Sequence, residues 1–142
     1  MKISERINYI ADWIIDYCNS IKNKPVALII GVSGGIDSSV TSTICAKTGL
    51  KTIVASMPIK QNQKQHNLSL KHIKWLKNKF SNIESHVISL DEIFKTFNLT
   101  MKNFNNNLAY ANSRSRLRMI TLYQIAQFNK GLVVGTGNKV ED

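Results

Sequence analysis

Apolar side chains recur every three or four residues along the first part of the chain. This spacing predicts an amphipathic helix that ends before Pro25. Its apolar positions are Ile3, Ile7, Ile10, Ala11, Ile14, Ile15, Cys18 and Ile21. Residues 26–32 then show no polar alternation, which is typical of a parallel strand that is covered on both faces.

Helical and extended patterns alternate from there to residue 134. An asparagine-rich stretch over residues 103–107 interrupts them, and it predicts a loop or the start of a helix. In chain order we predict a helix over 36–47, a strand over 52–57, a helix whose inner face carries residues 68, 73, 76 and 80, a strand over 84–90, a short helix around 93–97, a long helix over 108–128 and a strand over 132–134.

This alternation of strands and helices predicts an α/β fold. A chain of this order forms a parallel, twisted, Rossmann-like sheet with helices on both faces. The length of 142 residues corresponds to a single domain, residues 1–142. Ligands of such sheets bind beyond the carboxyl ends of the strands, and polar stretches follow three predicted strands, at 31–38, 57–65 and 135–142. We therefore expect one nucleotide site at this edge of the sheet.

Composition narrows the class of protein. No apolar run approaches the roughly 20 residues of a membrane helix, and the start of the chain lacks the features of a signal peptide, so we expect a cytoplasmic protein with no membrane partner. Cys18 and Cys45 lie among apolar neighbours without metal-binding spacing, which predicts buried, reduced thiols. The net charge of +10 would suit nucleic acid, but the lysines are scattered from Lys2 to Lys139.

A glycine- and serine-rich stretch follows the first predicted strand. Residues 31–39 read Gly-Val-Ser-Gly-Gly-Ile-Asp-Ser-Ser and lead into a predicted helix, so backbone N–H groups and the helix dipole converge on one point. Ser33, Ser38 and Ser39 add hydroxyl donors to this cradle for an anion. Asp37 stands where kinase-type P-loops have no acid, and an aspartate beside phosphates suits a magnesium ion between them. The alternative is a glycine turn with a helix-capping aspartate.

Two later stretches carry further polar chemistry. Residues 112–119 read Asn-Ser-Arg-Ser-Arg-Leu-Arg-Met; on a helix Arg114 and Arg118 share a face that Arg116 does not. Arginines there either hold phosphate or carboxylate in a cleft or form a solvated basic face. In residues 135–141, Thr136 can donate to a nucleotide and Glu141 can supply a metal ligand, although a polar turn would look the same.

Together these motifs resemble one family. The Ser-Gly-Gly-x-Asp-Ser loop resembles that of the ATP pyrophosphatases (adenine nucleotide alpha hydrolase-like fold), in which it grips the pyrophosphate of ATP. The Asn-x-x-x-Arg-x-Arg-Met stretch and the Val-Val-Gly-Thr-x-Asn-x-x-Glu stretch are similar to those of the NAD synthetases within that superfamily. The three motifs occur in the family order, and the resemblance spans nearly the whole chain.

The resemblance implies site residues one by one. It implies Asn112 and Arg116 as contacts of deamido-NAD, and Asp37 and Glu141 as ligands of Mg²⁺, without a nucleophilic side chain. It implies an ATP site made of Gly31, Val32, Ser33, Gly34, Gly35, Ile36, Asp37, Ser38, Met57 and Thr136.

The resemblance also implies an activity and partners. The nicotinate carboxylate of deamido-NAD attacks ATP, and ammonia converts the acyl-adenylate to NAD; family members are homodimers. They also continue for roughly another hundred residues past the position of Asp142, so we expect this chain to be part of a longer protein. The alternatives are an RNA-modifying or other adenylating enzyme, or an inactive nucleotide-binding fragment. No RNA-binding platform is evident, which argues against nucleic acid.

Overall fold

Four parallel strands form the centre of the protein in the computed structural model, which describes residues 1–60 and 62–137. The strands are β1 (Ala27–Gly31), β2 (Lys51–Ser56), β3 (Ile83–Val87) and β4 (Leu132–Val133), in the order β3-β2-β1-β4. Leu28 of β1 pairs with Thr52 on one side and with Leu132 on the other. This parallel Rossmann-like sheet confirms the predicted fold class.

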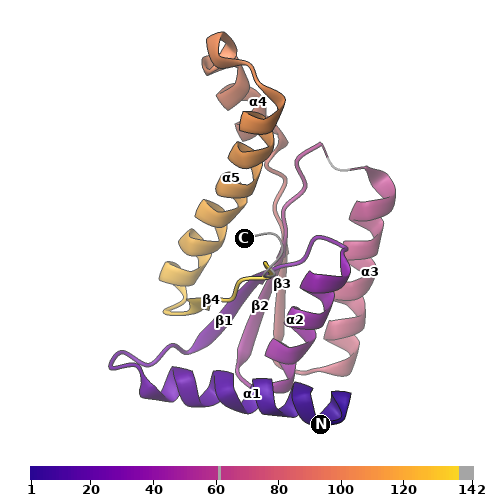
Figure 1. Ribbon diagram of the computed structural model, residues 1–142, viewed down its shortest axis with the longest axis vertical. Coiled ribbons are helices and arrows are strands. Elements are labelled where there is room, and N and C mark those ends of the chain that lie inside the picture. The colour runs from indigo at the N-terminus through magenta and orange to yellow at the C-terminus, as the bar shows by residue number, and fades with distance from the viewer. Residues whose placement is uncertain (61, 138–142) are drawn as a thin grey trace.

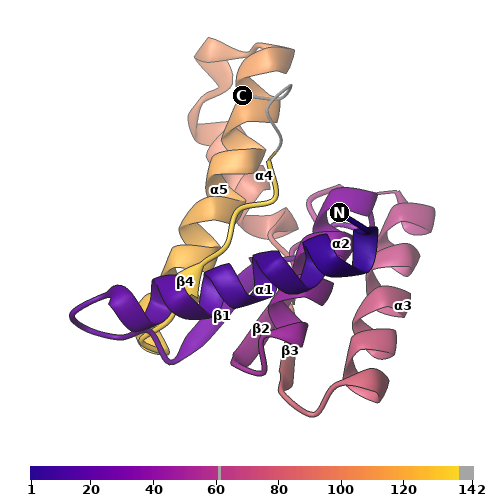
Figure 2. The same ribbon diagram turned by 60° about the horizontal axis from the view of Figure 1, so that its bottom comes forward.

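Helices cover both faces of the sheet (Figure 1). The helices α1 (Ile3–Ser20), α2 (Ile36–Lys47) and α3 (Gln63–Lys79) pack on one face, and α4 (Asp91–Thr100) and α5 (Asn107–Phe128) pack on the other, with the short 3-10 helix η1 (Lys102–Phe104) between the last two. Figure 2 shows α1 lying crosswise to α3, while α4 and the start of α5 extend beyond the carboxyl ends of the strands.

Alternate side chains of β1 fill two separate cores. Leu28 and Ile30 join the core under α1, α2 and α3, whereas Ala27 and Ile29 join the core under α4 and α5. All four are at most 1% exposed. A strand buried on both faces cannot alternate with polar residues, which is why its sequence reads as a continuous apolar run.

Several element boundaries differ from the predictions. The third strand ends at Val87, whereas the sequence predicted residue 90. The ladder between β2 and β3 ends at the pair Ser56 and Val87, and Leu90 is the N-cap of α4. Helix α3 starts at Gln63, earlier than its apolar positions suggest, because the Asn62 side chain accepts a hydrogen bond from the Gln65 amide at 2.7 Å. Asn106 caps α5 in the same way, so the asparagine-rich stretch does lead into a helix.

The two cysteines are buried, free thiols, as predicted. Burial raises the pKa of both thiols above the usual value, and it raises that of Cys45 to about 12. Thiolates are the reactive form, so these side chains serve as small core residues. Among the residues that the structure describes, no helix is long and apolar enough to span a bilayer.

Candidate functional site

The loop between β1 and α2 turns sharply where the sheet ends. Val32 makes one more sheet-like hydrogen bond, from its amide to the Ala55 carbonyl at 2.9 Å, and the chain then turns at Gly34, whose φ is +93°. Gly35 caps α2 with an extended backbone. The first turn of α2 therefore lies at the carboxyl edge of the sheet, where the helix dipole favours an anion.

Serine hydroxyls hold the loop in shape. The Ser33 amide donates to Ser38 Oγ at 3.1 Å, and the Gly35 amide donates to Ser33 Oγ at 3.2 Å. Ser38 Oγ donates back to the Gly35 carbonyl at 3.2 Å. Ser39 Oγ donates to the same carbonyl at 2.9 Å. Its side chain lines a hollow with His72 and Trp75 on the α2–α3 side, so Ser39 does not join the predicted cradle.

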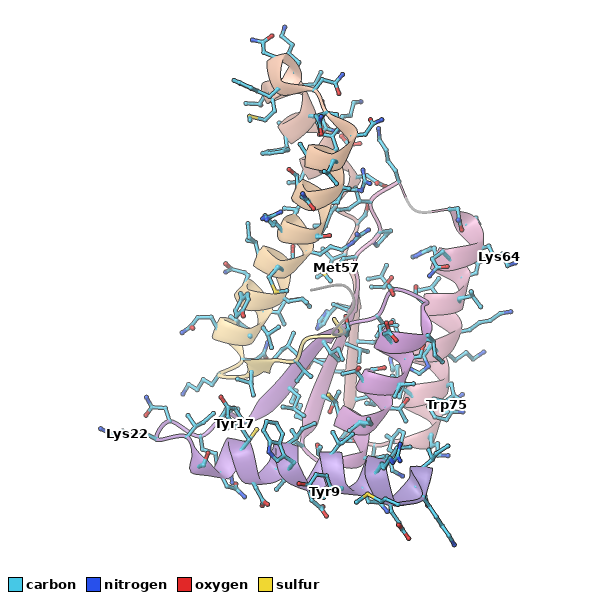
Figure 3. The ribbon with its side chains drawn as sticks, in the orientation of Figure 1. Tyr9, Tyr17, Lys22, Met57, Lys64 and Trp75 are labelled. Atoms are coloured by element: carbon cyan, nitrogen blue, oxygen red, sulfur yellow. The ribbon has the colours of Figure 1, made fainter. Side chains whose placement is uncertain are left out.

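A pocket of about 280 Å³ opens between the loop and α5. It lies where strand order reverses, since β1 connects to β2 through α2 on one face while β4 returns to the other side of β1 through α5. Met57, labelled in Figure 3, lies at the centre of this region. Besides Met57, the lining residues come from three stretches. They are Gly31, Val32, Ser33 and Ser38 at and after the end of β1, then Ser115, Arg118, Met119 and Leu122 of α5, and finally Val133, Val134, Gly135 and Thr136 after α5.

A more polar hollow adjoins this pocket at the start of α2. Ser33, Gly35, Ile36, Asp37, Ser38 and Thr136 line it. Of the ten residues that the sequence suggested for ATP, nine line one or both hollows. Ser33, Ser38 and Thr136 line both. The tenth, Gly34, faces α3 instead. Residues from three distant stretches therefore converge on one edge of the sheet.

Asp37 is the acidic residue in the first turn of α2, and its side chain is exposed. In the described part of the chain, no group of three His, Cys, Asp or Glu side chains forms a ready metal site. Glu141, the second predicted metal ligand, lies outside the described residues.

The three arginines of α5 have three different surroundings. Arg114 lies over the Phe94 ring, with its guanidinium carbon 5.7 Å from the ring centre. Arg116 borders a separate apolar pocket of about 220 Å³ that Phe97 and Ile120 also line. Arg118 reaches the pocket beside the loop, where its Nε donates to the Met57 carbonyl at 3.0 Å.

Arg118 lines the loop pocket, although sequence reasoning did not include it among the candidate site residues. The motif pointed to Arg116 and Asn112, but Arg116 does not line the loop pocket, and Asn112 is exposed on α5 and lines none of the hollows around the loop. Burial, together with the nearby charge of Arg114, lowers the pKa of Arg118 from its ordinary value. The spacing that puts Arg114 and Arg118 on one face was the available signal.

These features define a parallel α/β protein with a glycine- and serine-rich loop at the switch point of its sheet. The family model described as NAD synthase matches residues 6–142. The chain therefore belongs to the NAD synthase family.

Similar proteins share both sequence and fold with it. The NH(3)-dependent NAD(+) synthetase of Saccharolobus solfataricus is 38% identical, over 94% of this chain and 46% of its own length. An NMN synthetase structure from Francisella tularensis is 32% identical with a TM-score of 0.86, over 97% of this chain and 56% of that one. An NH3-dependent NAD synthetase structure from Campylobacter jejuni, in complex with nitrate, is 26% identical with a TM-score of 0.85, over 99% and 59%. The chain spans about half the length of the curated relatives it matches.

Proposed function

We propose that the protein catalyses the ATP-dependent amidation of deamido-NAD to NAD, with ammonia as nitrogen donor and with AMP and pyrophosphate as the other products. Membership of the NAD synthase family supports this proposal. The observation that carries it is the single pocket that the loop, Met57 and Thr136 line together. The N–H groups at the start of α2 suit phosphates and the apolar walls suit a base, so the pocket fits a nucleotide.

The proposed reaction has two displacements. An oxygen of the nicotinate carboxylate attacks the α-phosphorus of ATP, and pyrophosphate leaves. Ammonia then attacks the carbonyl carbon of the acyl-adenylate, loses a proton and expels AMP. Both centres are activated by their leaving groups, so no nucleophilic side chain is required. The protein contributes orientation and stabilisation of negative charge.

Each group of site residues has a proposed role. The N–H groups at the start of α2 hold the pyrophosphate part of ATP, Thr136 donates to the nucleotide, and Met57 forms the wall for adenine. Asn112 and Arg116 contact deamido-NAD from α5. This role rests on the resemblance of residues 112–119 to the family motif.

We propose that Asp37 and Glu141 hold Mg²⁺ together with phosphate oxygens of ATP. Asp37 is exposed beside the loop and lines the polar hollow with Ser33 and Thr136. Magnesium in nucleotide sites takes one or two carboxylates and keeps other ligands from phosphate and water, so one described carboxylate beside the phosphate loop fits this ion. When bound, Mg²⁺ neutralises phosphate charge as pyrophosphate leaves.

We also propose a cytoplasmic homodimer. Large apolar side chains are exposed on α5, including Leu108 at 71%, Ile120 at 65% and Phe128 at 86% exposure. Exposed apolar surface of this kind favours burial against another protein surface. Gel filtration with light scattering would test the dimer; a single species with the mass of one chain would contradict it.

A second candidate substrate is nicotinate mononucleotide. The specific observation is the similarity to a protein described as NMN synthetase, which at 32% identity exceeds the 26% identity with the Campylobacter jejuni synthetase structure. The two substrates share the nicotinate carboxylate and differ in the adenylate half. The chemistry proposed above is the same for both.

The deciding experiment offers both acids in parallel to the purified protein with ATP, MgCl₂ and an ammonium salt. We expect NAD and AMP in equal amounts from deamido-NAD, and little NMN from nicotinate mononucleotide, measured by chromatography with mass detection. Preferred formation of NMN would favour the second candidate. A matched reaction with glutamine in place of ammonium should give no product.

Two other outcomes would overturn the proposed function. Cleavage of ATP only in the presence of tRNA, without amidation of either acid, would favour an RNA-modifying enzyme. ATP binding without any AMP formation would favour a nucleotide-binding chain without activity.

A further inference from the structure

The backbone carbonyl of Met57 lies just beyond the end of a sheet ladder. Strands β1 and β2 pair up to Gly31 and Ala55, and the Val32 amide then donates to the Ala55 carbonyl at 2.9 Å. The next β1 donor that could reach Met57 would come from residue 34, but the chain has already turned into the loop there. A buried carbonyl requires a donor, and Arg118 supplies one through Nε at 3.0 Å.

A neutral side chain would satisfy this carbonyl equally well, so the charge of Arg118 needs a separate explanation. The side chain is partly buried, and no carboxylate among the described residues forms an ion pair with it. The neighbouring arginine of the same helix face, Arg114, adds repulsion. A positive charge in such a place is unfavourable unless an anion joins it.

The position of Arg118 identifies the anion. It lines the same pocket as Ser33, Ser38 and Thr136, and its Nε is anchored on Met57. The proposed ATP site has the pyrophosphate on the loop and adenine at Met57, so the α-phosphate lies between them, beside the guanidinium. An arginine has five N–H donors in one plane, and the Met57 carbonyl takes only one of them.

We propose that Arg118 is a nucleotide-binding residue that is anchored on the Met57 carbonyl through Nε and donates its remaining N–H groups to the α-phosphate. This inference rests on the proposed function for the nature of the nucleotide and adds a residue and a contact to it. The α-phosphorus is also the centre that the carboxylate attacks, so the same contact stabilises the charge that gathers there.

The test compares AMP with adenosine, which differ only in the α-phosphate. Isothermal titration of the wild-type protein and of Arg118→Met should show AMP and ATP binding about ten- to a hundredfold more weakly to the variant. Adenosine should bind both proteins within about twofold. Arg118→Lys keeps the charge without the planar fork, so it should recover part of the AMP affinity.

Arg114→Met is the matched control, because Arg114 lies one turn away on the same helix face and packs on Phe94 instead of lining the pocket. It should change the affinity for AMP much less than Arg118→Met does. Equal losses for AMP and adenosine in Arg118→Met would show a structural role and overturn the proposal, as would unchanged AMP binding. If Arg118→Met does not fold, the AMP-to-adenosine affinity ratio of Arg118→Lys decides: an unchanged ratio overturns the proposal.

Failure of this inference is distinguishable from failure of the proposed function. A wild-type protein that binds AMP and ATP through Arg118 but amidates no acid would leave the Arg118 contact standing and remove the proposed reaction. If the wild-type protein amidates deamido-NAD but Arg118→Met binds AMP with wild-type affinity, the proposed reaction stands and the Arg118 contact is overturned. A wild-type protein with no preference for AMP over adenosine would overturn the Arg118 contact.

Discussion

A β-carbon on Gly34 would lie 2.5 Å from the carbonyl oxygen of Gln65. The loop between β1 and α2 therefore touches the first turn of α3 at a distance that only glycine permits. Gln65 strengthens this contact, because its Nε2 donates to the Ser33 carbonyl at 3.1 Å. The shape of the loop thus depends on α3 as well as on the strand and helix that it joins.

Gly34→Ala should disrupt the proposed nucleotide site. The substitution adds a clash with backbone atoms of α3 and forces a side chain into a φ of +93°. We expect ATP to bind at least tenfold more weakly and the melting temperature to fall, measured by titration calorimetry and circular dichroism.

Gly49→Ala separates the effect of the clash with α3 from the effect of backbone strain at a positive φ. Gly49 also has a positive φ, +78°, but a β-carbon there would meet nothing within 4 Å. It should lower the melting temperature modestly through backbone strain alone and leave ATP affinity unchanged. Equal ATP affinity in Gly34→Ala and wild type would contradict the importance of the loop's contact with α3.

Asp37→Asn should strongly weaken the dependence of nucleotide binding on magnesium. The amide is isosteric but lacks the charge that an oxygen-ligated Mg²⁺ requires. In wild-type protein, addition of MgCl₂ should tighten ATP binding, whereas in Asp37→Asn it should change the affinity by less than about twofold. Asp12→Asn, at an exposed position on α1, is the control and should behave like wild type. An unaltered magnesium response in Asp37→Asn would remove Asp37 from the metal site.

Local sequence patterns predicted the sheet and the loop well, because both depend on short-range features. An uninterrupted apolar run and a glycine turn carry their own conformational preferences. The end of β3 was predicted wrongly. Residues 88–90 read Ile-Ser-Leu, an alternation that suits a strand, but the amides of Ile88 and Leu90 bond to the carbonyls of Ser56 and Pro58 outside the ladder. Pairing of that kind is set by the neighbouring strand.

The orientation of α5 was beyond local patterns. Apolar residues occur around the whole helix, and the structure buries Leu122 and Ala126 while leaving Ile120 and Phe128 exposed. Packing on β1 decides which side turns inward, and that choice also decides that Arg118 lines the loop pocket and Arg116 does not. The roles of Arg116 and Glu141 therefore stay predictions from the resemblance.

Stability should fall in mild acid because of His72. Its Nε2 lies 2.8 Å from Ser42 Oγ and joins α3 to α2, and burial lowers the pKa of His72 below its ordinary value of 6.5. The unfolded chain then takes up the proton at a higher pH than the folded protein. The contribution of His72 is therefore present above pH 6.5 and is lost as the pH falls through the lower folded value.

Urea unfolding at several pH values would measure this effect. His72→Gln should flatten the dependence of the unfolding free energy on pH below 6.5, whereas His86→Gln, on the exposed edge strand β3, should retain the His72-dependent loss. The same slope in His72→Gln and wild type would assign the acid sensitivity to other groups.

Gly131→Ala should loosen β4 and with it the wall that carries Thr136. A β-carbon on Gly131 would overlap Ile29 Cδ1 and lie 2.9 Å from the Ala27 carbonyl oxygen, so either the strand or the end of α5 must shift. We expect a loss of roughly 1–3 kcal/mol in unfolding free energy, together with weaker ATP binding, because Val134 bonds to Ile29 at 2.9 Å and leads directly to Thr136. Gly135→Ala is the control: it has nothing within 4 Å of its β-carbon and should retain wild-type stability. A Gly131→Ala protein as stable as Gly135→Ala would show that β4 tolerates the shift, and its ATP affinity would then report whether Thr136 depends on the position of the strand.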